Sequence, residues 1–267
     1  MVSIPDGPSR VAVTDCAYGL ARYAAICQNA GLVPIVEPEI LLDGDHDIDT
    51  TFEVASWVWA ETFKYLADNN VSFERMLLKP SMVGPGADCP KRNTPEEVAD
   101  ATIRMLKSRV PPSTAGIMFL SGGLSELDST LYLNAMNQSP NPWHVSFSYA
   151  RALQNTVLKT WAGDDAKKDE AQAILARRAK ENGMAQLGKF VAGDVSDSES
   201  ESTYQKNYVC ACLSLFTNFH LLRLCIPACF FLNSIPDLLL TFSSQTLPYR
   251  LSRSLQQPFL NAQLQLP

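Results

Sequence analysis

The sequence predicts an α/β protein in which helices cover a parallel sheet. Between about residues 9 and 160, short apolar segments alternate with longer segments whose apolar residues have the spacing of amphipathic helices. This alternation gives about four strand–helix units, whereas a closed (β/α)8 barrel needs eight. At 267 residues, the chain is long enough to bury one sizeable core.

The first predicted elements are two helices and two strands. Residues 9–29 have helical apolar spacing and are followed by Gly31, a residue typical of a helix C-terminus. A buried strand is expected over residues 32–40 (LVPIVEPEI) and a second over residues 75–80 (RMLLKP), with an amphipathic helix over residues 49–68 between them. Both predicted strands carry charged residues near their C-terminal ends.

The later elements begin with a clear helix start. Thr94 is followed by a proline and two glutamates, which supply an N-cap, a favourable first helical residue and acidic residues in the first turn. A helix is therefore expected over residues 95–109. The remaining predicted elements are a strand over 116–123 (GIMFLSGG), a helix over 125–138, a strand over 143–150 (WHVSFSYA) and helices over 151–160 and 165–187.

The composition changes towards the C-terminus. Residues 193–203 are acidic and small, as in a flexible linker. Beyond Val209 the sequence is rich in Leu, Phe, Ser, Cys and Pro, without a sustained helical or strand period. We therefore predict a folded domain over residues 1–192, an acidic linker over 193–209 and an unrelated extension over 210–267, which is disordered or, alternatively, a small apolar module.

The composition and the motifs exclude several classes of function. The formal net charge is −6, so the chain lacks the basic surface that nucleic-acid binding requires. Neither a metal site nor a nucleotide cofactor is expected, because the sequence has no zinc-type Cys/His spacing, no P-loop and no GxGxxG motif. Residues 221–242 are apolar, but prolines and charges interrupt them, so no membrane span is expected. The N-terminal residues resemble neither a secretory signal nor a transit peptide, so no targeting segment is predicted.

Lys79 is unusual because it stands at the C-terminal end of an apolar strand. Burying an ammonium group costs free energy, so such a position needs a reason. Desolvation and a nearby cation would lower its pKa and provide the neutral amine that attacks a carbonyl to form an imine. The alternative is a lysine whose charged end reaches out to solvent.

Glu37 and Glu39 flank Pro38, so in an extended strand both carboxylates project to one face. Such a pair suits proton transfer during imine formation and carbon–carbon cleavage, since each charge influences the pKa of the other. The alternative is a pair of salt-bridged acids at the rim of a barrel.

Ser121, Gly122 and Gly123 directly follow a predicted strand, and glycines let backbone N–H groups approach an anion closely. Arg151 stands just beyond the next strand and could bind a phosphate with two N–H groups. In (β/α)8 barrels the phosphate site commonly lies at the loops after the last two strands. The pattern indicates a phosphorylated ligand, and the alternative is a tight turn plus a surface arginine.

Four segments together resemble class I, Schiff-base-forming fructose-bisphosphate aldolases over about residues 2–208. They are LARYAAICQNAGLVPIVEPEILLDGDHD, MLLKPSMVGPG, GIMFLSGG and WHVSFSYARALQ, and PNPWHVSFSYARALQNT is closest to the plant plastid branch. The resemblance implies the C-terminal half of a (β/α)8 TIM barrel and reversible cleavage of fructose 1,6-bisphosphate into dihydroxyacetone phosphate and glyceraldehyde 3-phosphate. It further implies no metal or cofactor, a plastid or cytoplasmic location, and a family that is typically homotetrameric.

The resemblance also assigns roles to individual residues. Lys79 matches the Schiff-base lysine, Glu37 the acid/base and Glu39 a supporting carboxylate. Ser121, Gly122 and Arg151 match residues that hold a substrate phosphate. Cys210 stands where the family has its terminal tyrosine, and the first strands of the barrel have no counterpart. The alternative function is a non-catalytic, aldolase-like interaction subunit or the product of a misassigned gene.

Overall fold

The computed structural model describes residues 1–193 and 197–206, and four parallel strands form its sheet. The strands are hydrogen-bonded in the order β1-β2-β3-β4, which is also their order in the chain. They are β1 (Ile35–Val36), β2 (Leu77–Leu78), β3 (Gly116–Phe119) and β4 (Val145–Phe147). Parallel pairing of consecutive strands requires a crossover between each pair, and helices supply those crossovers.

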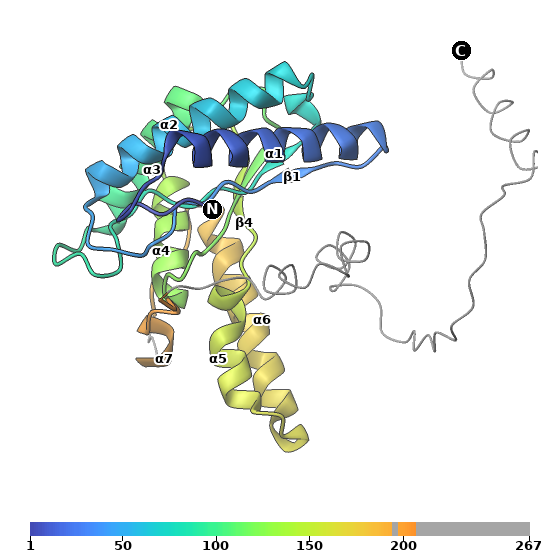
Figure 1. The fold of residues 1–267 in the computed structure, drawn as a ribbon. Coiled ribbons are helices and arrows are strands. Elements are labelled where there is room, and N and C mark those ends of the chain that lie inside the picture. Colours follow the sequence, from blue (N-terminus) through green and yellow to red (C-terminus); the bar gives the residue numbers. More distant parts are fainter. Residues whose placement is uncertain (194–196, 207–267) are drawn as a thin grey trace, which may run out of the picture. The chain divides into compact units, whose positions relative to one another are not determined.

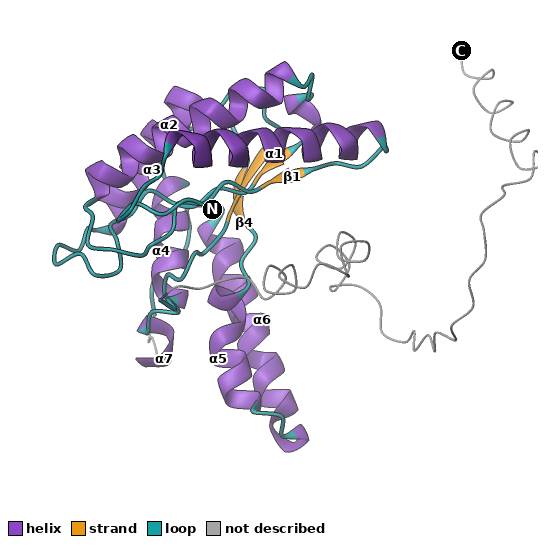
Figure 2. Ribbon diagram, viewed as in Figure 1, coloured by secondary structure: helices purple, strands orange, loops and turns teal. Residues whose placement is uncertain are grey.

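Helices pack along the sheet, and neighbours in the chain lie side by side (Figure 1). Helix α1 packs against α2, α2 against α3 and α3 against α4, while α6 contacts both α4 and α5. Figure 2 shows the short strands among these helices. The helices are α1 (Arg10–Asn29), α2 (Ile48–Asp68), α3 (Pro95–Arg109), α4 (Glu126–Met136), α5 (Arg151–Trp161), α6 (Lys168–Ala185) and α7 (Asp197–Ser200), with 3₁₀ turns η1 (Phe73–Arg75) and η2 (Asp165–Lys167).

One face of the sheet forms the centre of the hydrophobic core. One residue from each strand pairs with its neighbours in the next strands to form a row across the sheet, and the side chains in this row are at most 2% exposed. The row consists of Val36, Leu78, Ile117 and Val145. Because side chains alternate along a strand, the residues that follow this row point to the opposite face of the sheet.

The strands are shorter than the sequence predicts, and prolines explain the first two. Pro34 and Pro38 flank β1, and Pro80 follows β2, so none of these positions can donate a backbone hydrogen bond. Their carbonyls still accept: Leu77 N–H donates to Pro34 O at 3.0 Å. The extended backbone therefore continues past the short ladder on both sides.

The predicted start of α3 is confirmed in detail. Thr94 Oγ1 accepts from Glu97 N–H at 3.3 Å, and the Glu97 carboxylate accepts from Thr94 N–H at 3.0 Å. Since loss of an N-cap side chain typically costs about 1 kcal/mol, we expect Thr94→Ala to lower the free energy of unfolding by that amount in urea titrations. Thr94→Ser keeps the acceptor and should behave like the wild type. Equal stability of the Ala and wild-type proteins would contradict the capping role.

Residues 197–206 contact the body of the fold. Ser202 Oγ donates to Gly123 O at 3.1 Å, and Thr203 Oγ1 donates to Leu124 O at 2.8 Å. The predicted division into domain, linker and extension stays a prediction, since the whole extension over 210–267, with its apolar segment 221–242, lies outside the described residues. Within the described part, no helix combines the length and apolar character that a membrane crossing requires.

Candidate active site

The charged residues singled out in the sequence lie where β1 and β2 end. Val36 pairs with Leu78, so Glu37 and Lys79 come next in the two strands as neighbours. Both follow the buried row and therefore point to the opposite face of the sheet. Lys79 N–H donates to Val36 O at 2.7 Å. This bond extends the pairing of β1 and β2 by one residue and fixes the position of the Lys79 backbone.

Lys79 forms an ion pair with Glu37. Lys79 Nζ lies 3.1 Å from Glu37 Oε1, and the two side chains are 22% and 46% exposed. The lysine therefore stays largely covered instead of extending into solvent. A proton can pass directly between the amine and the carboxylate at this distance. The roles of nucleophile and acid/base remain predictions that this geometry favours.

Glu39 occupies a more buried position on the same segment. Burial raises the pKa of its carboxyl above the ordinary value, and the Glu37 carboxylate raises it further, while the positive charges of the chain's amino terminus, Arg151 and Lys79 oppose the rise. A Cβ added at Gly122 would lie 3.6 Å from Glu39 Oε1, so this carboxyl faces the loop after β3. The Glu39 carboxyl therefore keeps its proton to a higher pH than an ordinary glutamate does.

The raised pKa of Glu39 predicts a pH dependence of stability. The folded protein binds this proton more tightly than the unfolded chain does, so stability is lost as pH rises from the ordinary carboxyl pKa through the raised one. Glu39→Gln should remove this loss and flatten the decline above about pH 4.5 in urea titrations, whereas Glu74→Gln at an exposed site should not. Parallel stability curves for wild type and Glu39→Gln would exclude this effect.

The loop after β3 has a backbone conformation that favours glycine. Gly122 and Gly123 have φ angles of +55° and +97°, and Leu124 N–H donates to Ser121 O at 2.9 Å to close the turn. A Cβ on Gly123 would also approach Tyr204 Cα to 3.1 Å. Ser121 is 6% exposed. A tight glycine turn is therefore present beside the Glu39 carboxyl, and its role in phosphate binding stays a prediction.

Arg151 is the first residue of α5, directly after the segment that follows β4. Its Nη1 donates to Thr203 O at 2.7 Å, and its charge acts on Glu39. The structure therefore brings Arg151 and the β3 loop to the same segment, residues 202–204. The same segment also contacts the loop after β1, since the Tyr204 hydroxyl donates to Asp43 Oδ1 at 2.8 Å.

The contacts of residues 202–204 were missed by sequence reasoning. The residues around them are small, polar and acidic, which is typical of a linker. Tyr204 could have indicated these contacts, because an aromatic residue in such a stretch usually packs against the folded domain. A cavity of about 500 Å³ opens between this segment, the loop before α3 and the start of α4. Its lining includes Gly123, Tyr132 and Tyr204, but not Lys79 or Glu37.

The donor groups in this region do not form a metal site. Among the described residues, no three His, Cys, Asp or Glu side chains converge in a way that could hold a metal ion. The chemistry available at the strand ends is that of a lysine amine, two carboxyls and the N–H groups of a glycine turn and an arginine.

Comparison with known proteins decides the family. The profile of "Fructose-bisphosphate aldolase class-I" matches residues 1–210. The chain belongs to the class I fructose-bisphosphate aldolase family. Membership confirms the predicted fold class: the four parallel strands and their helices correspond to part of the family's barrel. Enzymes of this family are lyases that act on sugar phosphates.

Individual aldolases are similar over the same region. The chain is 66% identical to the chloroplastic fructose-bisphosphate aldolase 1 of Chlamydomonas reinhardtii over 209 residues, covering 78% of this chain and 55% of the relative. It is 63% identical to a chloroplastic aldolase of Oryza sativa, covering 78% of this chain and 54% of that one. A fructose-bisphosphate aldolase of Plasmodium falciparum, solved with TRAP and a small-molecule inhibitor, superposes with a TM-score of 0.70 at 44% identity, covering 72% and 56% of the two chains. The chain thus spans about half the length of the curated aldolases it matches.

Proposed function

We propose that this chain carries the Schiff-base lysine and one phosphate-binding end of a fructose-bisphosphate aldolase site. The reaction is the reversible cleavage of fructose 1,6-bisphosphate into dihydroxyacetone phosphate and glyceraldehyde 3-phosphate. The observation that carries the proposal is the 3.1 Å contact between Lys79 Nζ and Glu37 Oε1 at the ends of two adjacent parallel strands. Membership of the aldolase family supports the choice of substrate.

In this proposal Lys79 and Glu37 share the proton transfers. Lys79 gives a proton to Glu37 and attacks the ketone carbon as a neutral amine, forming a carbinolamine. Glu37 returns the proton to the hydroxyl of that intermediate, which leaves as water and gives the iminium. Glu37, again a carboxylate, then accepts the proton of the sugar's C4 hydroxyl as the C3–C4 bond breaks. The electron pair of that bond forms the C2=C3 bond of an enamine on Lys79, and the aldehyde departs. Glu39 is the supporting carboxylate beside this pair, and burial and the Glu37 charge raise its pKa.

The second part of the proposal concerns the substrate phosphate. Ser121, Gly122 and Arg151 would hold it, with the turn providing hydroxyl and backbone N–H donors and the guanidinium providing a fork. Arg151 Nη1 donates to Thr203 O at 2.7 Å, so the guanidinium lies against the same segment that contacts the glycine turn. Residues 202–204 would then lie beside the bound phosphate.

Cleavage of fructose 1,6-bisphosphate by the purified 267-residue chain tests this proposal. Triose phosphate should form in a coupled assay, and Glu37→Gln should slow its formation by about 10²-fold or more if Glu37 is the acid/base. If no triose phosphate forms with folded protein, the chain is instead a non-catalytic, aldolase-like subunit. The open four-stranded sheet favours that second candidate, because its edge strands could pair with another chain.

We further propose that the protein assembles into a homo-oligomer, typically a tetramer in this family, and functions in the plastid. The plastid location is supported by the names of its relatives, which are chloroplastic aldolases. Sedimentation of the purified chain and imaging of a tagged protein in a plant or algal cell test the two statements separately.

A further inference from the structure

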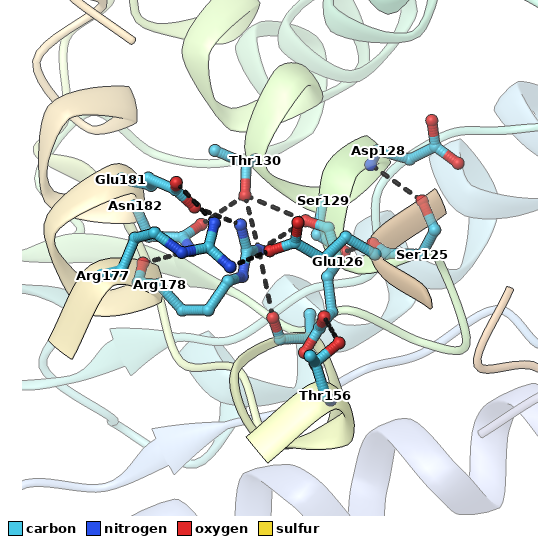
Figure 3. A network of polar contacts seen from close by, with 12 residues as sticks. Ser125, Glu126, Asp128, Ser129, Thr130, Thr156, Arg177, Arg178, Glu181 and Asn182 are labelled. Atoms are coloured by element: carbon cyan, nitrogen blue, oxygen red, sulfur yellow. Dashed lines mark hydrogen bonds and ion pairs between the residues drawn. The ribbon is translucent and has the colours of Figure 1, made fainter. Parts of the chain in front are cut away.

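A buried polar network links α4, α5 and α6 (Figure 3). Its two most deeply buried charged members are Glu126, which is 0% exposed, and Arg178, which is 2% exposed. Burying such groups is costly unless hydrogen bonds satisfy them. The partners of these hydrogen bonds therefore show which helices the network connects.

Glu126 reaches from α4 to the middle of α5. Its Oε2 accepts from Thr156 Oγ1 at 2.5 Å, and its Oε1 accepts from Thr156 N–H at 3.2 Å. Arg178 reaches the same turn from α6, since its Nη2 donates to Ala152 O at 3.2 Å. In an α-helix the N–H of Thr156 and the carbonyl of Ala152 are the pair that normally bond each other. Glu126 and Arg178 thus bind the donor and the acceptor of one backbone hydrogen-bond pair in α5.

Arg178 also ties α5 to the start of α4. The same Nη2 donates to Glu126 O at 2.7 Å and to Thr130 Oγ1 at 3.0 Å, and Nη1 pairs with Glu181 at 2.6 Å. Thr130 Oγ1 in turn contacts Asn182 Oδ1 at 3.1 Å. The first turns of α4 and α5 are therefore fixed against one another through a single guanidinium group.

Of the two helix starts held in this way, that of α5 carries Arg151, and that of α4 follows the turn with the other proposed phosphate ligands. Glu126 is the first residue of α4, directly after the turn that contains Ser121 and Gly122, and Ala152 follows Arg151 in α5. Helix α5 has no side-chain cap of its own, because Ala150 occupies the N-cap position, whereas α1 to α4 begin with capping Ser, Asp, Thr and Ser side chains. The start of α5 is stabilised from within the core instead.

We propose that Glu126 and Arg178, acting through Thr156 and Ala152, are positioning residues that set the distance between the β3 turn and the Arg151 guanidinium. This inference rests on the proposed function, in which that turn and Arg151 hold one substrate phosphate. Neither positioning residue needs to touch the substrate. Their effect on binding follows from geometry, since small displacements of a ligand-binding group can cost up to 10²-fold.

The test uses Thr156 because its side chain can be changed without altering volume. In the full chain, Thr156→Val should weaken binding of inorganic phosphate and of dihydroxyacetone phosphate by about tenfold in calorimetry, while Thr156→Ser keeps the hydroxyl and restores binding. Thr62→Val is the matched control: Thr62 is 0% exposed and its hydroxyl donates to Val58 O at 2.8 Å in α2, away from the site. It should lower the melting temperature without changing phosphate binding.

A parallel measurement separates positioning from loss of the Schiff-base site. Borohydride trapping of dihydroxyacetone, which has no phosphate, should be equal in wild type and Thr156→Val. The inference is overturned if Thr156→Val binds phosphate as well as wild type, if Thr62→Val weakens binding equally, or if phosphate binding by the wild type does not depend on Arg151. Failure to trap any ketone at Lys79, with phosphate binding still dependent on Thr156, would instead remove the proposed function and leave the positioning role.

Discussion

Replacing Lys79 with methionine is expected to abolish covalent trapping of dihydroxyacetone phosphate by borohydride. Methionine is similar in length to lysine and fits a largely buried position, but it has no amine to form the imine. Incorporation should fall by about 10²-fold or more, to the level of non-specific reduction, as expected when a covalent nucleophile is lost. Intact-mass spectrometry of the reduced protein measures the incorporation directly.

The matched control for this experiment is Lys64→Met. Lys64 is an exposed lysine in α2 that pairs with Asp68 at 3.3 Å, and it lies outside the strand ends. Its replacement should leave incorporation at the wild-type level. An adduct still formed by Lys79→Met would contradict the assignment of Lys79 as the nucleophile. Loss of the adduct in both variants would show that the effect is not specific to Lys79.

Replacing Arg178 with methionine is expected to cause a large loss of stability. The guanidinium is 2% exposed and donates to a carboxylate, a hydroxyl and two backbone carbonyls. Removing one member of a buried, hydrogen-bonded charge network typically costs about 3–5 kcal/mol, because the remaining polar groups stay buried without partners. We therefore expect the free energy of unfolding to fall by about 3 kcal/mol in urea titrations.

An exposed arginine provides the comparison. Arg22→Met removes a surface guanidinium that lies over the Tyr18 ring at 5.7 Å, and such contacts are worth about 1 kcal/mol or less. A loss of stability in Arg178→Met no larger than that in Arg22→Met would show that the network of Figure 3 is not a stabilising element. The positioning role proposed for Arg178 would then lose its physical basis.

Local signals in the sequence predicted the elements of this fold well. Thr94 is a capping residue by type and position, and it forms the predicted cap. The strands were located by their apolar residues, but their lengths were overestimated because prolines around β1 and β2 cut the hydrogen-bonded ladder short. Lys79 and Glu37 stood out because charged residues at the end of buried strands are uncommon, and the structure places them in contact.

The buried network could not be predicted in the same way. Arg177 and Arg178 are adjacent in α6, and both resemble residues of a solvated helix face. Only packing distinguishes them: the Arg177 side chain is 43% exposed and that of Arg178 is 2% exposed. Glu126 was likewise indistinguishable from an ordinary acidic residue in the first turn of a helix. Which face of α4 and α6 is buried depends on contacts between helices that are far apart in the sequence.

The most direct test of the Schiff-base assignment is to map the trapped adduct in the unaltered 267-residue protein. The purified chain is incubated with dihydroxyacetone phosphate, reduced with borohydride, digested and analysed by tandem mass spectrometry. The proposed function predicts one modified lysine, Lys79, with labelling that inorganic phosphate suppresses by competing at Ser121, Gly122 and Arg151. An adduct on another lysine, or none on folded protein, would contradict it.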